Sequence, residues 1–262
     1  MKIDYTGKTV VITGATGQIG SALCEMFAIN GATVAICARN VESANRLQEK
    51  IINEGGKAEC FYLDVTDRNS LFSMAEEIAK RCNGIDVLIN NAGVNVPTDD
   101  RKPVHEFKNE NWDWIIDVDL NGVFNCTKAF VPFIKEKGGG NILNISSVVG
   151  IVPFRNQIAF TAAKAGVINF SKAAALELAN SNIRVNVIAP GSILFEGTKA
   201  LFYSDKEKAE KMLVNIPMHR AGDAKDIAKA ALYLASDEDA AYVTGAVLTV
   251  DGGWTCGFAR DF

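Results

Sequence analysis

The feature that most constrains the fold of this chain is a regular alternation of two kinds of segment. Short runs rich in apolar and β-branched residues occur at residues 9–14, 32–38, 58–65, 85–93, 140–147, 183–191 and 245–253. Amphipathic stretches of helical length separate them, at residues 18–30, 41–54, 67–82, 110–135, 157–181 and 223–236. The short runs are almost continuously apolar, which is typical of strands buried on both faces. The alternation therefore predicts βαβ units and a parallel sheet.

The chain has 262 residues and shows no linker, repeat or low-complexity segment. We therefore predict one α/β domain over residues 1–262, a doubly wound Rossmann-type fold with about seven parallel strands and helices on both faces. Residues 192–222 are the one long irregular region, with the charged sequence YSDKEKAEK between apolar patches. They are either a lid over the substrate or a surface insertion.

Composition excludes several functional classes. The net charge of −4, from 27 basic and 31 acidic residues, argues against binding to a nucleic-acid backbone. The six cysteines are scattered, and the only histidines are His105 and His219, so we expect neither a metal site nor a disulfide framework. No apolar run approaches the roughly 18 residues that cross a membrane. These observations, with an N-terminus unlike a signal peptide, predict a cytoplasmic protein.

The first apolar run ends in the glycine-rich sequence TGATGQIG, directly before a helical stretch. Gly14, Gly17 and Gly20 would let the backbone approach a pyrophosphate, while the helix N-terminus supplies N–H donors and the positive end of its dipole. The alternative is a glycine-rich turn that binds nothing. The βαβ context favours dinucleotide binding.

The end of the second predicted strand indicates which dinucleotide binds. An acidic residue there would accept a hydrogen bond from the 2′-hydroxyl of NAD and repel a 2′-phosphate. This chain carries Ala38-Arg39 instead, and an arginine can pair with that phosphate. We therefore predict NADP as the cofactor, with NAD as second choice; the alternative role for Arg39 is a solvated side chain after a strand.

The motifs and their order resemble the short-chain dehydrogenase/reductase family over essentially the whole chain. The matching segments, besides the glycine turn and an F-x-x-x-K helix, are LDVTD (63–67), NNAG (90–93), DLNGVF (119–124), NISS (144–147), APG (189–191) and VTGAVLTVDGG (243–253). The resemblance implies a homotetramer or homodimer that moves a hydride between NAD(P)(H) and an alcohol or carbonyl compound. The segments APGSILFEGTKALF and PMHRAG look closest to gluconate or mannonate dehydrogenases, which act on sugar acids or polyols.

The resemblance also implies a set of cofactor-binding residues. At the diphosphate these are Gly14, Thr16, Gly17, Gln18, Ile19 and Gly20. Asp64 and Val65 would flank the adenine, and Asn91, Ala92 and Gly93 would line the ribose side. At the nicotinamide the implied residues are Pro190, Gly191 and Ile193.

The catalytic residues that the resemblance implies are only partly present. Ser147 matches the serine that hydrogen-bonds the substrate oxygen, and Lys164 matches the lysine that binds the nicotinamide ribose and lowers the pKa of a neighbouring tyrosine. The tyrosine position carries Phe160, and the asparagine that would anchor a proton-relay water is Asp119. Phe195 stands where the family usually has a threonine near the carboxamide.

Three interpretations of these departures remain open. The tyrosine was replaced by design in an otherwise ordinary enzyme, or a natural variant enzyme takes its proton through Asp119, Ser147 or bound water. In the third interpretation the protein binds NAD(P) without catalysis, as a sensor or as a partner subunit. Without a general acid the rate would fall by roughly 10²–10⁴-fold, while Ser147 could still polarise a carbonyl.

Overall fold

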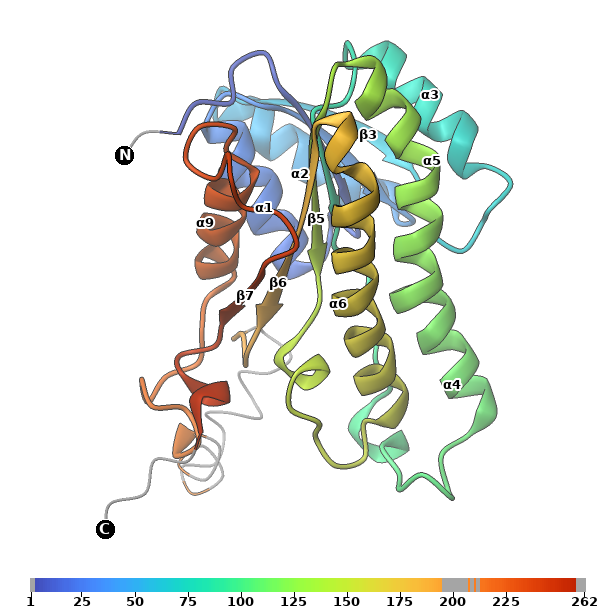
Figure 1. Ribbon diagram of the computed structural model, residues 1–262, viewed down its shortest axis with the longest axis vertical. Coiled ribbons are helices and arrows are strands. Elements are labelled where there is room, and N and C mark those ends of the chain that lie inside the picture. Colours follow the sequence, from blue (N-terminus) through green and yellow to red (C-terminus); the bar gives the residue numbers. More distant parts are fainter. Residues whose placement is uncertain (1–2, 195–206, 208–209, 211–212, 258–262) are drawn as a thin grey trace.

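The computed structural model describes residues 3–194, 207, 210 and 213–257. Seven strands form one parallel sheet in the order β3-β2-β1-β4-β5-β6-β7 (Figure 1). The strands are β1 Thr9–Thr13, β2 Thr33–Ala38, β3 Lys57–Tyr62, β4 Val87–Asn90, β5 Gly140–Ile145, β6 Ile183–Pro190 and β7 Val247–Val250. Each overlaps one of the apolar runs, and the predicted parallel sheet is confirmed.

Helices cover both faces of this sheet (Figure 1). The α-helices given for the described residues are α1 Gln18–Ile29, α2 Val41–Asn53, α3 Leu71–Arg81, α4 Asn109–Ile116, α5 Gly122–Glu136, α6 Ile158–Leu178 and α9 Ala224–Ala235. Short 3-10 turns are η1 Thr98–Asp100, η3 Val148–Gly150, η4 Ala179–Ser181 and η5 Trp254–Cys256. Within the described residues, α1, α2 and α9 pack on one face and α3, α5 and α6 on the other.

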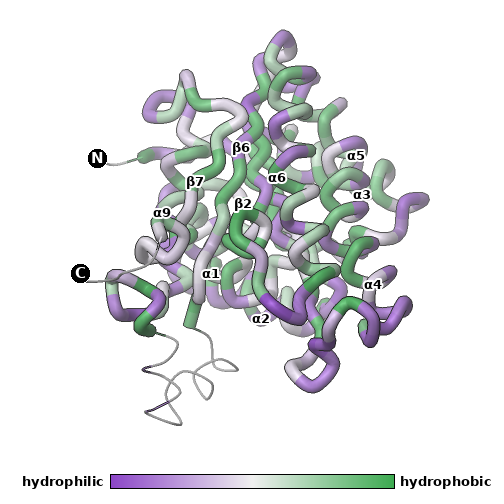
Figure 2. Tube along the Cα trace, turned by 60° about the horizontal axis from the view of Figure 1, so that its bottom comes forward, coloured by the Kyte–Doolittle hydropathy of each residue, from purple (hydrophilic) through white to green (hydrophobic). Residues whose placement is uncertain are grey.

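Burial on both faces explains why the strands are apolar without alternation. In β1, Val10 and Ile12 belong to the core under α1, which includes Phe27. The intervening Val11 points to the opposite face and joins the core that contains Phe130 of α5. Figure 2 shows the same property along β2 and β6, whose traces are predominantly hydrophobic. A strand of this kind is stable only with helices on both sides.

One predicted helix, residues 110–135, is interrupted in the structure. It consists of α4, a π-helical segment η2 at Asp117–Asn121, and α5. Within this segment, Asp119 contacts Lys164 and the backbone N–H of Val94. A helical sequence pattern carries no signal for such a local change, and π-helical turns are frequent at functional sites.

The sheet order places a crevice near its middle. The strand order reverses between β1 and β4, so the segments that follow them diverge to opposite faces and leave space at the carboxyl ends. Of the predicted lid at 192–222, residues 195–206, 208–209 and 211–212 lie outside the described residues, and the lid stays a prediction. No helix in the described part of the chain has the length and apolar character to span a lipid bilayer.

Candidate functional site

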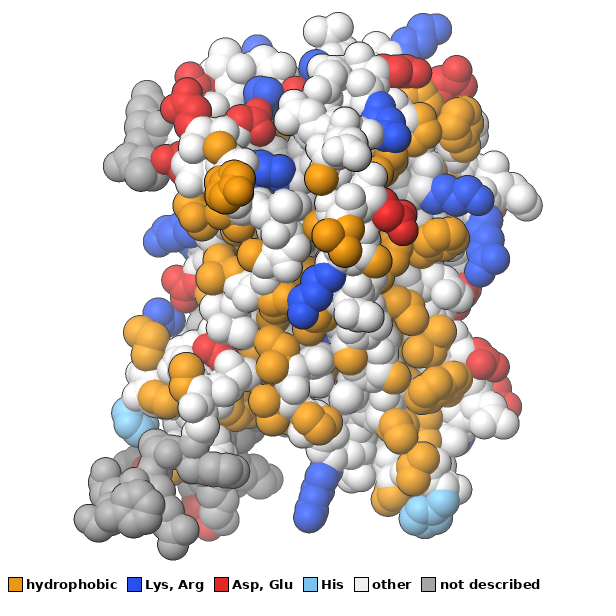
Figure 3. All heavy atoms as spheres, viewed as in Figure 1, with side chains coloured by type: hydrophobic (Ala, Val, Ile, Leu, Met, Phe, Trp, Pro, Cys, Tyr) orange, Lys and Arg blue, Asp and Glu red, His pale blue; other side chains and the backbone are white. Residues whose placement is uncertain are grey.

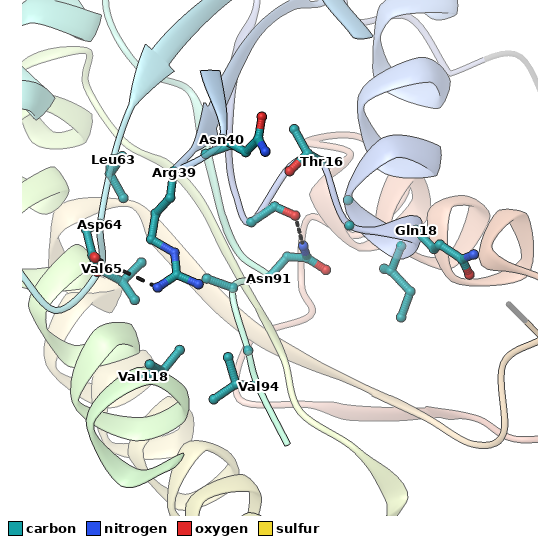
Figure 4. A pocket seen from close by; sticks show the side chains of 17 residues that line it. Thr16, Gln18, Arg39, Asn40, Leu63, Asp64, Val65, Asn91, Val94 and Val118 are labelled. Carbon is teal, nitrogen blue, oxygen red and sulfur yellow. Dashed lines mark hydrogen bonds and ion pairs between the residues drawn. The ribbon is translucent and has the colours of Figure 1, made fainter. Parts of the chain in front are cut away.

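A cavity of about 600 Å³, here called the Gly14 cavity, lies at the carboxyl ends of β1 to β4 (Figure 4). Every cofactor residue predicted between Gly14 and Gly93 lines it. The lining also includes residues to which the sequence analysis assigned no binding role, namely Ala38, Asn40, Leu63, Val94 and Val118. Their positions directly beside Arg39, Asp64 and Gly93 would have been a usable signal for all of them except Val118.

The glycine turn brings backbone close to this cavity. Gly14 has a φ of +60°, and a Cβ on it would lie 2.7 Å from the Cα of Ala92. A Cβ on Gly20 would collide with the carbonyl oxygen of Gly14. Helix α1 starts just after Gly17, with no side-chain cap and no acidic residue in its first turn. Its first N–H groups are therefore suited to an anionic group in the cavity.

The turn is fixed to the end of β4 by polar side chains. Asn91 Nδ2 donates to the carbonyl oxygens of Thr13, at 3.0 Å, and Gly14, at 3.1 Å. Thr13 Oγ1 accepts hydrogen bonds from the backbone N–H groups of Asn91 and Ala92. These bonds join the two strands at which the sheet order reverses, so the cavity has a rigid floor.

Arg39 extends from the end of β2 into the cavity, toward Asp64 (Figure 4). Its Nη1 lies 4.0 Å from Asp64 Oδ2, and the arginine side chain is 61% exposed. Asp64 is held by its other oxygen, Oδ1, which accepts from the backbone N–H and the hydroxyl of Thr66. Because an exposed ion pair contributes little free energy, Arg39 can leave Asp64 at small cost when a better partner enters.

The second part of the site is a buried cluster around Lys164. Lys164 Nζ lies 3.0 Å from Asp119 Oδ2 and donates to the carbonyl oxygen of Ile145 at 3.3 Å. Asp119 Oδ1 accepts from the backbone N–H of Val94 at 2.7 Å. Its Oδ2 is fully buried and takes part in the ion pair without an aligned hydrogen bond. The structure therefore places the predicted Asp119 directly beside the predicted lysine.

Phe160 presents its ring to the same ammonium group. Lys164 Nζ lies 5.4 Å from the ring centroid, within the range of a cation–π interaction. The two residues are one helical turn apart on α6, and the half-buried ring packs against the small core cluster of Val96, Ile115, Ala159 and Ala163. In this position the ring contributes no proton donor or acceptor.

Ser147 lies at the same end of the sheet, just after β5. It caps η3, and its Oγ accepts from the backbone N–H of Val149 at 3.3 Å. The neighbouring Ser146 Oγ donates to the carbonyl oxygen of Lys164 at 2.8 Å. This bond fixes α6 against the end of β5, and it keeps Ser147 and Lys164 in a constant relation.

The predicted nicotinamide residues follow β6. Pro190 ends that strand, a Cβ on Gly191 would lie 2.8 Å from the Cα of Asp251, and the buried Ile193 forms a bridge with Gly222. Like Lys164, these three residues are not part of the Gly14 cavity lining. Phe195 lies outside the described residues.

A second cavity, of about 360 Å³ and here called the Trp254 cavity, adjoins η3. Sequence reasoning missed it. Its described lining combines Val148 and Val152 with Phe154, Val214 and Trp254, which are far apart in the chain. Among the residues described, no three or more His, Cys, Asp or Glu side chains are grouped so that they could hold a metal ion.

The known proteins that this chain resembles are reductases, dehydrogenases and oxidoreductases, matched over nearly its whole length. Residues 14–255 match the family model described as enoyl-(acyl carrier protein) reductase. The 3-oxoacyl-[acyl-carrier-protein] reductase FabG of Thermotoga maritima is 43% identical over 248 residues, covering 94% of this chain and 97% of that protein.

Two solved structures are similar over nearly the whole chain. One is a provisionally named 2-deoxy-d-gluconate 3-dehydrogenase of Agrobacterium tumefaciens with bound NADP, which is 34% identical with a TM-score of 0.87, covering 98% of this chain and 99% of that one. The other is a provisionally named D-mannonate oxidoreductase of Haemophilus influenzae with bound NAD. It is 29% identical with a TM-score of 0.90, covering 97% of each chain.

Proposed function

This chain belongs to the short-chain dehydrogenase/reductase family of oxidoreductases, and from that premise we propose that it uses NADP(H) to interconvert a ketone and an alcohol. The observation that carries the proposal is the position of Gly93. It lines the Gly14 cavity, and a Cβ on it would lie 3.1 Å from Asp119 Oδ2 and 3.2 Å from Lys164 Nζ. A dinucleotide in that cavity would therefore end next to the Lys164 cluster, defined as Lys164, Asp119, Phe160 and Ser147.

The lining of the Gly14 cavity fits a dinucleotide along its length. The uncapped start of α1 would bind the diphosphate, because its N–H groups and dipole favour negative charge. Asp64 and Val65 would flank the adenine, and Asn91, Ala92 and Gly93 the ribose. Beyond them Lys164, with Pro190, Gly191 and Ile193 after β6, would surround the nicotinamide.

The preference for NADP over NAD rests on the end of β2. Residues 38–40 carry no carboxylate, so nothing there would repel a 2′-phosphate. Arg39 already reaches into the cavity, and its partner Asp64 is held only at 4.0 Å. A phosphate would offer charge-assisted hydrogen bonds that this pair lacks. The relatives with bound NADP and bound NAD leave both cofactors open for this chain.

Reduction of a ketone needs a hydride, which bound NADPH supplies, and a proton for the carbonyl oxygen. Ser147 Oγ would hold that oxygen and polarise the bond. Phe160 has no proton to give, so in this proposal the proton comes from the Lys164 ammonium. It would pass a proton to the oxygen directly or through water, and solvent would later return that proton, while Asp119 holds the lysine in place through their ion pair.

A second candidate function is cofactor binding without turnover, as a sensor or a partner subunit. The observation that favours it is the set of contacts around Lys164. Its ammonium is already occupied by Asp119, the carbonyl oxygen of Ile145 and the ring of Phe160. A lysine held by three protein groups has little freedom to serve a substrate.

The outer face of α5 and α6 supports the proposal that the protein forms a homo-oligomer, either a tetramer or a dimer. Leu176 is 82% exposed and Phe124 50% exposed, and Phe124 meets Phe170 edge to face. Figure 3 shows further hydrophobic side chains over these two helices. We expect a second copy to cover this face, and Leu176→Lys to lower the mass measured by light scattering.

The cysteines support a reducing compartment such as the cytoplasm. All six are free, and only Cys256 is exposed. Burial raises the pKa of Cys126 to about 12, which keeps this thiol protonated and unreactive. Six titratable thiols in the unfolded, unreduced protein would agree with this location, and a lower number would contradict it.

Two measurements on the whole protein test the function. Fluorescence titration should give saturable binding of NADPH, and NADPH oxidation with a panel of ketones should exceed the rate without protein. Binding without oxidation would favour the non-catalytic candidate. Absence of binding to both NADPH and NADH would contradict both candidates.

A further inference from the structure

We propose that the substrate is a ketone with a compact apolar substituent, a single ring or a short alkyl chain, seated in the Trp254 cavity. The inference rests on the proposed function and defines its substrate class. Ser147 caps η3, and Val148 of that turn lines the cavity, so the cavity adjoins the segment that carries the hydroxyl. In this proposal a ketone held by Ser147 extends its substituent along η3 into this space.

The described walls of the Trp254 cavity are largely apolar. The rings of Phe154 and Trp254 stand 4.8 Å apart between centroids, with an angle of 36° between their planes. Val152 is 45% exposed and Val214 is 59% exposed, although both border a concave space. Apolar surface concentrated at a cavity indicates a binding site, because an apolar ligand removes it from water.

The polar groups of the cavity are few. Asn215 and Thr255 are the polar side chains on its described lining, and no lysine, arginine or histidine lies there. Thr255 Oγ1 already donates its proton to Asp251 Oδ2, at 2.7 Å. A sugar acid would bring a carboxylate and several hydroxyls, each of which loses free energy when it leaves water without a partner. The described lining therefore offers few partners to the sugar acids or polyols that the sequence resemblance implies, and it favours an apolar substituent.

The size of the cavity limits the substituent. Its volume of about 360 Å³ lies at the lower end of the roughly 300–1,000 Å³ of small-molecule sites. A ring or a short chain can fill such a space, whereas a long acyl chain would extend beyond it. A flat ring would in addition find the aromatic faces of Phe154 and Trp254.

Binding to the NADP⁺ complex tests this inference without requiring turnover. Calorimetry would compare acetophenone, a compact aryl ketone, with 5-keto-D-gluconate, a keto sugar acid. We expect acetophenone to bind at least about 10-fold more tightly, from burial of its ring. Tighter binding of the sugar acid, or no binding of acetophenone, would overturn the inference. Failure of NADP⁺ itself to bind would instead overturn the proposed function.

Three variants locate the binding. Trp254→Ala removes one aromatic wall, and Val152→Asp places a carboxylate at an exposed position of the lining, where folding should tolerate it. Each should weaken acetophenone binding by about 10-fold and leave NADP⁺ affinity unchanged. The control is Ile151→Asp, because Ile151 is 43% exposed but not on the described lining; its effect should stay within about 2-fold. Unchanged acetophenone affinity in both cavity variants would overturn the inference.

Discussion

The Gly14 cavity and the Lys164 cluster lie side by side, yet they relate to the sequence in opposite ways. The cavity is built from backbone that only glycine permits, at Gly14 and Gly20, and from short polar links such as Asn91 to Thr13. The cluster is built from side chains, and two of its four members are not the residues that the family resemblance implies. Dinucleotide binding depends on shape and backbone donors, whereas reaction chemistry depends on single functional groups. A protein can therefore keep the first while it alters the second.

Among the substitutions considered, Phe160→Tyr should change the chemistry of the Lys164 cluster most. The new hydroxyl would lie next to the Lys164 ammonium, whose charge stabilises a phenolate and lowers its pKa. We expect kcat for ketone reduction to rise by roughly 10²–10⁴-fold. NADPH affinity should change little, because the residues proposed for the diphosphate and the adenine lie in the Gly14 cavity, which Phe160 does not line.

Stopped-flow measurement of NADPH oxidation would check this expectation. The control is Phe170→Tyr, a half-buried phenylalanine six residues after Lys164 on the same helix, whose described ring contact is with Phe124 of α5; this change should leave kcat unaltered. An unaltered rate in Phe160→Tyr, with normal NADPH binding, would favour the non-catalytic candidate. Ordinary turnover by the parent protein would show instead that the hydroxyl is not needed.

The second largest effect is expected for Asp119→Asn. The substitution leaves Lys164 buried without its counter-charge, and we expect kcat to fall by about 10- to 100-fold if the pair supplies the proton. The matched control is Asp117→Asn in the same π-helical segment, where the carboxylate bonds only to Asn121 among the contacts described. Unchanged kcat with weaker NADPH binding would mean that Asp119 only positions the lysine.

A smaller effect is expected for Arg39→Ala. Loss of the guanidinium should weaken NADPH binding by about 10-fold, the range of a charged hydrogen bond, and leave NADH binding nearly unaltered. Arg46→Ala serves as control, because Arg46 lies on α2 and its described bond is to Ser43. Equal losses for both nucleotides would remove the argument for NADP.

The smallest effect is expected at Asp237, which contacts Lys8 and Asn141 near the amino ends of β1 and β5. Burial raises the pKa of Asp237, but hydrogen bonds from Lys8 and Asn141 and the nearby charges of Lys8 and Arg184 outweigh it and leave the pKa below 3.8. A lowered folded pKa gives stability that is present above 3.8 and is lost as the pH falls through the folded value.

Asp237→Asn should accordingly cost at most about 1 kcal/mol at pH 7, since the side chain is 55% exposed. Urea unfolding at pH 7 and near pH 3 would measure the difference, which should shrink at the lower pH. Cofactor and ketone binding should not respond, because Asp237 lines neither cavity. An equal cost at both pH values would exclude the ionic explanation.

The Gly14 cavity and the members of the Lys164 cluster were both predicted from the sequence, but the first follows from topology and the second from the family resemblance. Gly14, Arg39, Asp64 and Asn91 each follow a strand, and parallel strands bring their carboxyl ends to one edge, so the meeting of these residues follows from topology alone. The pairing of Asp119 with Lys164 depends on a π-helical segment inside a predicted helix. Local periodicity does not reveal such a change.

The Trp254 cavity was beyond sequence reasoning for a related reason. Phe154 and Trp254 are separated by a hundred positions in the chain, and neither belongs to a motif with a known spacing. Their contact depends on the paths of two irregular segments, which no strand or helix pattern fixes. The role of residues 192–222 stays a prediction, because most of them lie outside the described residues.

The order of the two cavities along the chain has a consequence for biosynthesis. The Gly14 cavity is lined by residues 14–118, whereas the described lining of the Trp254 cavity begins at Val148 and extends to Gly257. Translation therefore completes the residues proposed for the diphosphate, the adenine and the adjacent ribose well before the last residues that surround the proposed substrate. Because a ligand that binds only folded protein favours folding by mass action, we expect a nicotinamide dinucleotide to stabilise the first part of the fold before the proposed ketone can bind. The ketone can assist only the finished protein.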